Sequence, residues 1–214
     1  MPDAHSEFDS RATDRLTLFS DAVVAIAITL LAIDLPVPTG STAGAFLASV
    51  KDNSGHYWAF LLSFWAIAGA WSNHHDIFRY TDRTDARLRQ LDMSWLLMIV
   101  LTPFAARLLT AHGSQTTGVH VLRYGFYALV QALESAILVT MLRHMNDHGL
   151  ARELPGQTVT RVTRRSYALV AGFTLSIPVF FLIPWAWVLW IVVPSASDRW
   201  HKYRREQTTN DDPR

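Results

Sequence analysis

Apolar residues in this 214-residue chain gather in blocks, and short polar or charged stretches separate the blocks. A helix needs about 20 apolar residues to cross the hydrocarbon core of a bilayer, and several blocks approach that length. The pattern predicts six membrane-spanning helices, at residues 16–35, 57–73, 91–110, 119–142, 166–183 and 185–196. The second block allows an earlier start near residue 43, and the sixth is short enough to be tilted or partly interfacial.

The last two blocks are separated by Pro184, which we interpret as the site of a tight turn. A single helix through both would hold about thirty apolar residues, too many for one ordinary span. We therefore predict six spans rather than five.

Basic residues are concentrated in alternate connections. Four arginines lie in residues 79–89, five in residues 143–165, and four basic residues in 199–205, whereas the loop after the first span holds only Lys51. Because basic loops remain in the cytoplasm, this alternation predicts that both termini are cytoplasmic. Two cytoplasmic termini require an even number of spans.

The blocks imply a single membrane domain. We predict a disordered N-terminus at residues 1–10, a six-helix domain at 11–202 with a basic cytoplasmic linker at 144–165, and a disordered tail at 203–214. The first residues are polar and partly acidic, unlike the basic start of a signal peptide, so we expect the first span to be retained.

Composition excludes several kinds of site. The chain has no cysteine and a net charge of +1, which exclude a disulfide framework and a thiolate metal site and argue against nucleic acid as a partner. His74 and His75 are adjacent and diverge by about 100° on a helix, a poor geometry for one metal ion. No nucleophile–base pair is visible, so we expect no metal, no cofactor and no enzymatic activity.

The first span contains a charge. An ionisable side chain at the centre of a membrane helix costs roughly 2.5–3.5 kcal/mol. Asp21 lies about 9 Å along the helix axis from Arg15, which opens the span. We expect His74 or Asn73, at similar depth in the second span, to donate a hydrogen bond to Asp21. Both a packing bond and an ion or proton site fit this pattern.

The first span also carries an apolar stripe. Ala22, Ile26, Thr29 and Ile33 share one face of the helix, and Leu30 lies at its edge. The stripe fits a lipid-facing or packing surface. It also fits a pore in which several copies meet, with isoleucine constrictions and a threonine ring between them. Asp34 would then place negative charge near the outer mouth.

Three sequence elements resemble one family. They are RLTLFSD at residues 15–21, SFW and WSNHH at 63–65 and 71–75, and LTPF at 101–104. The first, with its Arg-x-x-x-Phe-Ser-Asp spacing, is similar to the signature of the transmembrane protein 175 family of endolysosomal potassium channels and their bacterial relatives. The six predicted spans of this chain also resemble the bacterial members, which carry one six-helix repeat rather than two.

The resemblance implies a homotetrameric channel in the plasma membrane of a bacterium. Such a channel passes potassium and other monovalent cations and is more permeable to potassium than to sodium. It implies that the first span lines the pore, with these residues at the constriction: Ile26, Thr29, Leu30 and Ile33. It also implies a signature network that holds the first span against the second, formed by these residues: Arg15, Phe19, Ser20, Asp21 and His74.

The chain departs from the family in one position that bears on this network. Asp92 stands near the start of the third span where the family would lead us to expect asparagine. No TVGYG sequence is present, so any selectivity must arise from a narrow apolar passage and nearby hydroxyls.

Two other functions remain open from the residues alone. One is a proton-coupled transporter that uses the ionisable residues Asp21, His74, Asp92 and Glu134, although no pair of broken helices or internal repeat supports it. The other is a membrane scaffold that conducts no ions.

Overall fold

The structure is a computed structural model, and it describes residues 4–111, 117–151, 155–180, 188–190 and 192–193. These residues are almost entirely helical, and a single isolated β-bridge joins Thr81 to Ala151. The helices are α1 (Ala4–Ile33), α2 (Ala43–Asp52), α3 (Ser54–Phe78), α4 (Ala86–Thr110), α5 (Thr117–Asp147) and α6 (Gly156–Phe180).

Five of the six predicted spans coincide with long helices, namely α1, α3, α4, α5 and α6. Of the sixth, at 185–196, only residues 188–190 and 192–193 are described, and they are helical. Residues 43–52 form a separate helix, α2, rather than an early start of the second span. The backbone leaves helical geometry at Asn53 (φ −93°, ψ 7°), which ends α2 and precedes α3.

Three segments of the described chain are long and apolar enough to cross a membrane: Arg11–Ile33, Ala86–Thr110 and Gly118–Asp147. Helices α3 and α6 form where spans were predicted, but their described residues are not apolar enough to be counted among these three segments. Helix α3 contains the polar sequence SNHHD near its end, and α6 begins with a basic segment.

Helices extend past two of the predicted boundaries. Helix α1 extends back to Ala4, through most of the segment predicted to be disordered, because adding residues to an existing helix is far easier than starting one. The predicted linker at 144–165 is largely helical, since α5 continues to Asp147 and α6 begins at Gly156. The tail at 203–214 lies outside the described residues.

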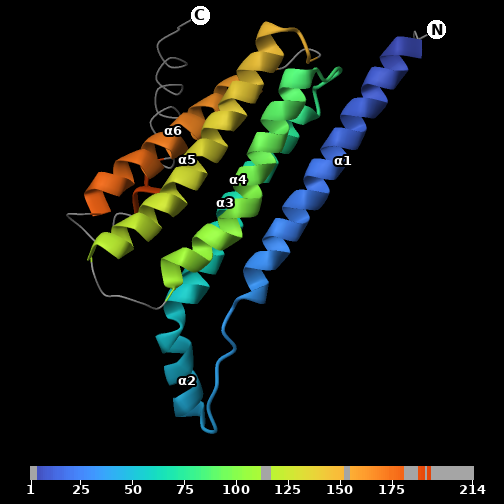
Figure 1. The fold of residues 1–214 in the computed structure, drawn as a ribbon. Coiled ribbons are helices and arrows are strands. Elements are labelled where there is room, and N and C mark those ends of the chain that lie inside the picture. Colours follow the sequence, from blue (N-terminus) through green and yellow to red (C-terminus); the bar gives the residue numbers. More distant parts are fainter. Residues whose placement is uncertain (1–3, 112–116, 152–154, 181–187, 191, 194–214) are drawn as a thin grey trace, which may run out of the picture.

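The long helices run side by side, with α1 at one edge of the bundle and α5 and α6 at the other (Figure 1). Helix α1 packs on α3 and α4, and α5 packs on α4 and α6. Helix α2 contributes no buried residue and projects from one end of the bundle (Figure 1).

The start of α1 and the α3–α4 and α5–α6 connections lie at the same end of the bundle (Figure 1). The two connections are joined directly, because the backbone N–H groups of Asp82 and Arg83 both donate to the carbonyl of Leu150, at 3.0 and 3.2 Å. An ion pair between Arg161 and Asp76 adds a link between α6 and α3. The arginine-rich connections thus share one end of the bundle with the start of α1.

Polar side chains join the helices inside the bundle. The hydroxyls of Ser63 and Tyr127 lie 3.2 Å apart between α3 and α5, and Thr102 of α4 donates to Gln131 of α5 at 3.0 Å. Lipid tails are as apolar as the side chains between membrane helices, so packing and hydrogen bonds select which helices meet.

Candidate pore helix and its supporting contacts

Helix α1 has one buried face and one exposed face. Val24 and Ala27 are 2% and 1% exposed where the helix packs on its neighbours, whereas Ile26 and Ile33 are 59% and 77% exposed. Thr29 is exposed between these two isoleucines, and Leu30 is exposed at the edge of the same stripe. All four predicted constriction residues therefore lie on the face of α1 that the subunit leaves uncovered.

The hydroxyl of Thr29 donates to the backbone carbonyl of Ile26, at 2.8 Å. This bond satisfies the donor within the helix itself and leaves oxygen lone pairs as acceptors. A threonine bonded in this way is compatible with lipid and with a water-filled pore.

The buried face of α1 is held by a polar network that reaches two other helices. Ser20 donates from α1 to Oδ2 of Asp92 on α4 at 2.8 Å, and Oδ1 of Asp92 lies 2.7 Å from Nε2 of His74 on α3. All three side chains are completely buried. Asp92 therefore joins α1, α3 and α4 at one point.

His74 is further fixed by aromatic rings on both of its faces. Phe78 stacks at a centroid distance of 4.2 Å, and Trp95 of α4 stacks at 4.3 Å with an interplanar angle of 13°. These contacts leave His74 little freedom to rotate, so its bond to Asp92 has a defined direction.

The expected bond from His74 or Asn73 to Asp21 is wrong. Asp21 instead accepts from Nε1 of Trp71 on α3, at 2.8 Å, while His74 pairs with Asp92. Asp21 belongs to α1 and Asp92 to α4, and depth counted along the sequence could not assign each carboxylate to its donor on α3. The contact still joins the first span to the second, as expected.

The structure brings only part of the predicted signature network together. Ser20, Asp21 and His74 lie at the contacts of α1 with α3 and α4, whereas Arg15 and Phe19 are exposed. Among the described residues, no hydrogen bond or ion pair joins Arg15 to α3. A role for these two side chains in that network stays a prediction.

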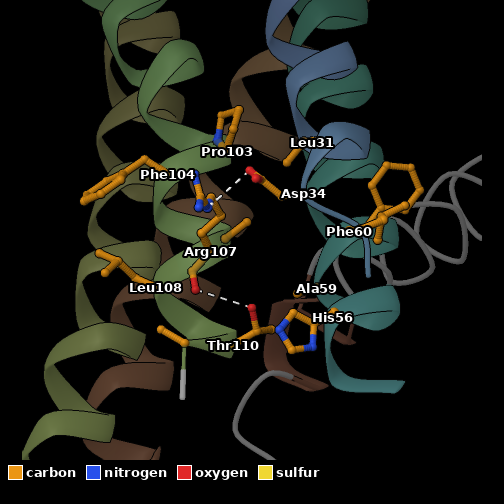
Figure 2. A pocket seen from close by; sticks show the side chains of 13 residues that line it. Leu31, Asp34, His56, Ala59, Phe60, Pro103, Phe104, Arg107, Leu108 and Thr110 are labelled. Atoms are coloured by element: carbon orange, nitrogen blue, oxygen red, sulfur yellow. Dashed lines mark hydrogen bonds and ion pairs between the residues drawn. The ribbon is translucent and has the colours of Figure 1, made fainter. Parts of the chain in front are cut away.

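A cavity of about 490 Å³ opens at the Ile33 end of α1, where α1, α3 and α4 meet (Figure 2). Asp34 points into it and forms an ion pair with Arg107 of α4, with Oδ2 and Nε 3.2 Å apart. His56, Phe60 and Phe104 also line the cavity. Asp34 was predicted to place negative charge near the outer mouth of a pore, and Arg107 offsets part of that charge within the subunit.

Sequence reasoning missed two residues of the supporting network, Trp71 and Trp95, and did not predict the central position of Asp92. A tryptophan in a membrane helix resembles any other large apolar residue, so nothing in the pattern marks its N–H as a donor. Asp92 did carry a signal, since a carboxylate in an apolar helix needs a partner.

Glu134, in the middle of α5, is also buried and bonded, with Oε1 accepting from Nε1 of Trp95 at 2.7 Å. All four ionisable groups considered for proton-coupled transport thus have partners within the subunit. In the part of the chain that the structure describes, no group of three or more histidine, aspartate or glutamate side chains is arranged to hold a metal ion.

The segment that forms these contacts between α1, α3 and α4 is similar to a known protein family. A family model described as the endosomal/lysosomal potassium channel TMEM175 matches residues 15–103, which include the signature, α3 and most of α4. A crystal structure of a lysosomal potassium-selective channel TMEM175 homolog from Chamaesiphon minutus has a similar fold. Its TM-score is 0.68 at 23% identity, over 90% of this chain and 98% of that one.

The expected resemblance to the transmembrane protein 175 family is confirmed.

Bacterial relatives extend the family similarity. A protein named as a potassium channel from Streptomyces collinus is 29% identical over 170 residues, which cover 78% of this chain and 82% of the relative. A potassium channel from Chryseobacterium is 30% identical over 129 residues, or 60% of this chain and 64% of the relative. One from Chamaesiphon minutus is 38% identical over 103 residues, or 47% and 50% of the two chains.

Proposed function

We propose that this protein is a passive cation channel that prefers potassium to sodium and assembles as a homotetramer around α1. The exposed apolar stripe of α1 carries the proposal. This chain is similar to potassium channels, so we infer that the stripe of one subunit faces the same stripe of three other subunits. Each α1 would present it to a common axis while its opposite face stays packed on α3 and α4.

The constriction in this proposal consists of apolar rings. Ile26 and Ile33 are separated by about 10 Å along a helix axis, with Thr29 between them and Leu30 at the edge. Apolar rings restrict ion flow by excluding water, and threonine oxygens between them can replace part of the hydration shell of a cation. Because the sequence has no TVGYG filter, we expect only modest selectivity for potassium.

The proposed orientation follows from charge. The arginine-rich connections share one end of the bundle with the start of α1, and we assign this end, with both termini, to the cytoplasm of a bacterial cell. Asp34 then lies near the outer mouth, where its pairing with Arg107 weakens its attraction for cations. The channel needs no cofactor in this proposal, and the potassium ion is its cargo.

Potassium flux into liposomes that contain the purified protein tests this function. We expect passive flux that favours potassium over sodium without an imposed proton gradient. Ile26→Asn should raise the flux by wetting the constriction, and Thr29→Val should change the potassium/sodium ratio. Leu129→Asn, at an exposed apolar position on α5, is the matched control and should change neither.

Uptake that occurs only with a proton gradient would contradict the proposal and favour a transporter. An Ile26→Asn effect no larger than that of Leu129→Asn would contradict the placement of α1 on the axis.

A further inference from the structure

Glu134 is a buried carboxyl in the middle of α5, far in sequence from the signature on α1. A carboxyl group inside a membrane helix is costly and is usually retained for a role. Its side chain is oriented by two donors, since Oε1 accepts from Nε1 of Trp95 at 2.7 Å and Oε2 accepts from the hydroxyl of Ser135 at 3.3 Å.

The Trp95 bond connects Glu134 to the network behind the proposed pore helix. Trp95 is completely buried, and its ring stacks almost parallel to His74. His74 in turn pairs with Asp92, which accepts from Ser20 on α1. A continuous series of contacts therefore runs from α5 through α4 and α3 to the buried face of α1.

We propose that Glu134 is a positioning residue for the proposed pore helix. By holding the indole N–H, it fixes the plane of Trp95 and hence the face against which His74 rests. His74 then presents Nε2 to Asp92 in one direction, and the Asp92–Ser20 bond sets the rotation of α1 about its axis. That rotation decides which residues of α1 occupy the exposed stripe.

Several other polar side chains surround Glu134. A small cavity of about 70 Å³ lies beside it, lined also by Gln131, Arg165 and Ser166. The hydroxyl of Ser166 is buried and has no hydrogen-bond partner in the described part of the chain. A cavity of this size with several polar side chains in its lining has room for ordered water, which would solvate the carboxyl on the side away from Trp95.

Gln131 supplies a matched comparison. It is a buried polar residue about one turn from Glu134 on α5, and it too bonds α4, by accepting from Thr102 at 3.0 Å. Thr102 shares its one hydroxyl hydrogen with the carbonyl of Met98 in its own helix, so this bond does not continue toward α1. Losing Gln131 should loosen the α4–α5 contact without turning α1.

The test measures the rotation of α1 directly. The chain has no native cysteine, so Ala22→Cys introduces a single thiol on the exposed stripe. Its rate of reaction with a water-soluble thiol reagent is compared in liposomes with Glu134→Leu, Glu134→Gln or Gln131→Leu added. We expect Glu134→Leu to change the rate by roughly 2- to 30-fold, the range of coupling along packed networks. Glu134→Gln, which keeps an acceptor for Trp95, and Gln131→Leu should leave the rate close to that of the parent.

A second variant tests the route. Trp95→Phe removes the N–H but keeps a stacking ring, so it should reproduce the change of rate, and Glu134→Leu should add little to it. An unchanged rate in Glu134→Leu, an equal change in Gln131→Leu, or fully additive effects with Trp95→Phe would overturn the inference. If Glu134→Leu does not fold, Trp95→Phe alone decides, and an unchanged rate in that variant overturns it.

The inference rests on the proposed function in one respect only, the expected change in ion flux. If α1 lines the pore, the potassium/sodium flux ratio should change in the same variants as the labelling rate. If the unmodified protein carries no passive potassium flux, the proposed function fails while the labelling rates still test the positioning role of Glu134. A changed labelling rate with an unchanged flux ratio would show that α1 turns but does not line the conducting path.

Discussion

At the scale of single residues, the bundle is specified by a few polar side chains that each find a partner on another helix. Asp92 satisfies one donor from α1 and one from α3, and burial of all three side chains makes the bonds mutually dependent. Removing one member leaves the others unpaired in an apolar environment, which costs more than the bond contributes.

Asp92→Ala should therefore destabilise the protein by about 1–3 kcal/mol for each of the two buried hydrogen-bonding groups, on Ser20 and His74, that it leaves without a partner. Asp92→Asn should cost less, since its amide oxygen can still accept one of the two hydrogen bonds. Thermal or denaturant unfolding in detergent measures both variants.

The control is Ser94→Ala, two residues away on α4, where the hydroxyl is exposed and bonds only within its own helix. We expect its effect to stay within about 0.5 kcal/mol. An Asp92→Ala variant as stable as Ser94→Ala would refute a structural role for the triple contact.

At the scale of helices, the ends of α4 and α5 are joined by one capping acid. Asp85 accepts from the backbone N–H of Leu88 at 2.6 Å, which caps α4, and Nε2 of His144 in the last turn of α5 lies 2.7 Å from its other oxygen. Burial favours the neutral acid, but the bonds from Leu88 and His144 outweigh it, so the pKa of Asp85 is lowered below its usual value.

This lowered pKa predicts a direction for pH dependence. A carboxyl whose pKa is lower in the folded state contributes stability above its unfolded value of about 3.9, and that contribution is lost as the pH falls through the folded value. The unfolding midpoint should therefore fall more steeply below about pH 4 in the unmodified protein than in Asp85→Asn.

Asp52→Asn, at an exposed position of α2, is the control and should follow the unmodified protein over the same pH range. Identical acid profiles for the unmodified protein and Asp85→Asn would show that the cap contributes no pH-dependent stability.

At the scale of the whole molecule, the subunit leaves one full face of α1 uncovered while α1 lies at the edge of the bundle (Figure 1). In the proposed assembly this face is covered by other copies. The purified protein should then have the mass of four 24.1 kDa chains after correction for bound detergent.

Cysteine cross-linking tests the same arrangement in the membrane. Ile33→Cys should form disulfides between subunits under mild oxidation, because residues close to a common axis can bring their Cα atoms within about 7 Å. Leu129→Cys, on the outside of α5, should not. A monomeric mass, or cross-links at residue 129 but not at 33, would contradict assembly around α1.

The sequence by itself determined the positions of five long helices and the division of α1 into two faces. Both follow from the length and the 3.6-residue period of apolar runs, which are local properties of the chain. It also determined the family similarity, because the signature at residues 15–21 is a contiguous pattern.

Only the tertiary structure decided which polar groups meet. Asp21 bonds Trp71 rather than His74, Asp34 is paired with Arg107, and Glu134 supports Trp95. Depth along a helix can be counted in the sequence, but a contact between helices also depends on which helices are neighbours and how each is rotated. Those two quantities are set by packing over the entire bundle, so no single stretch of the chain contains them.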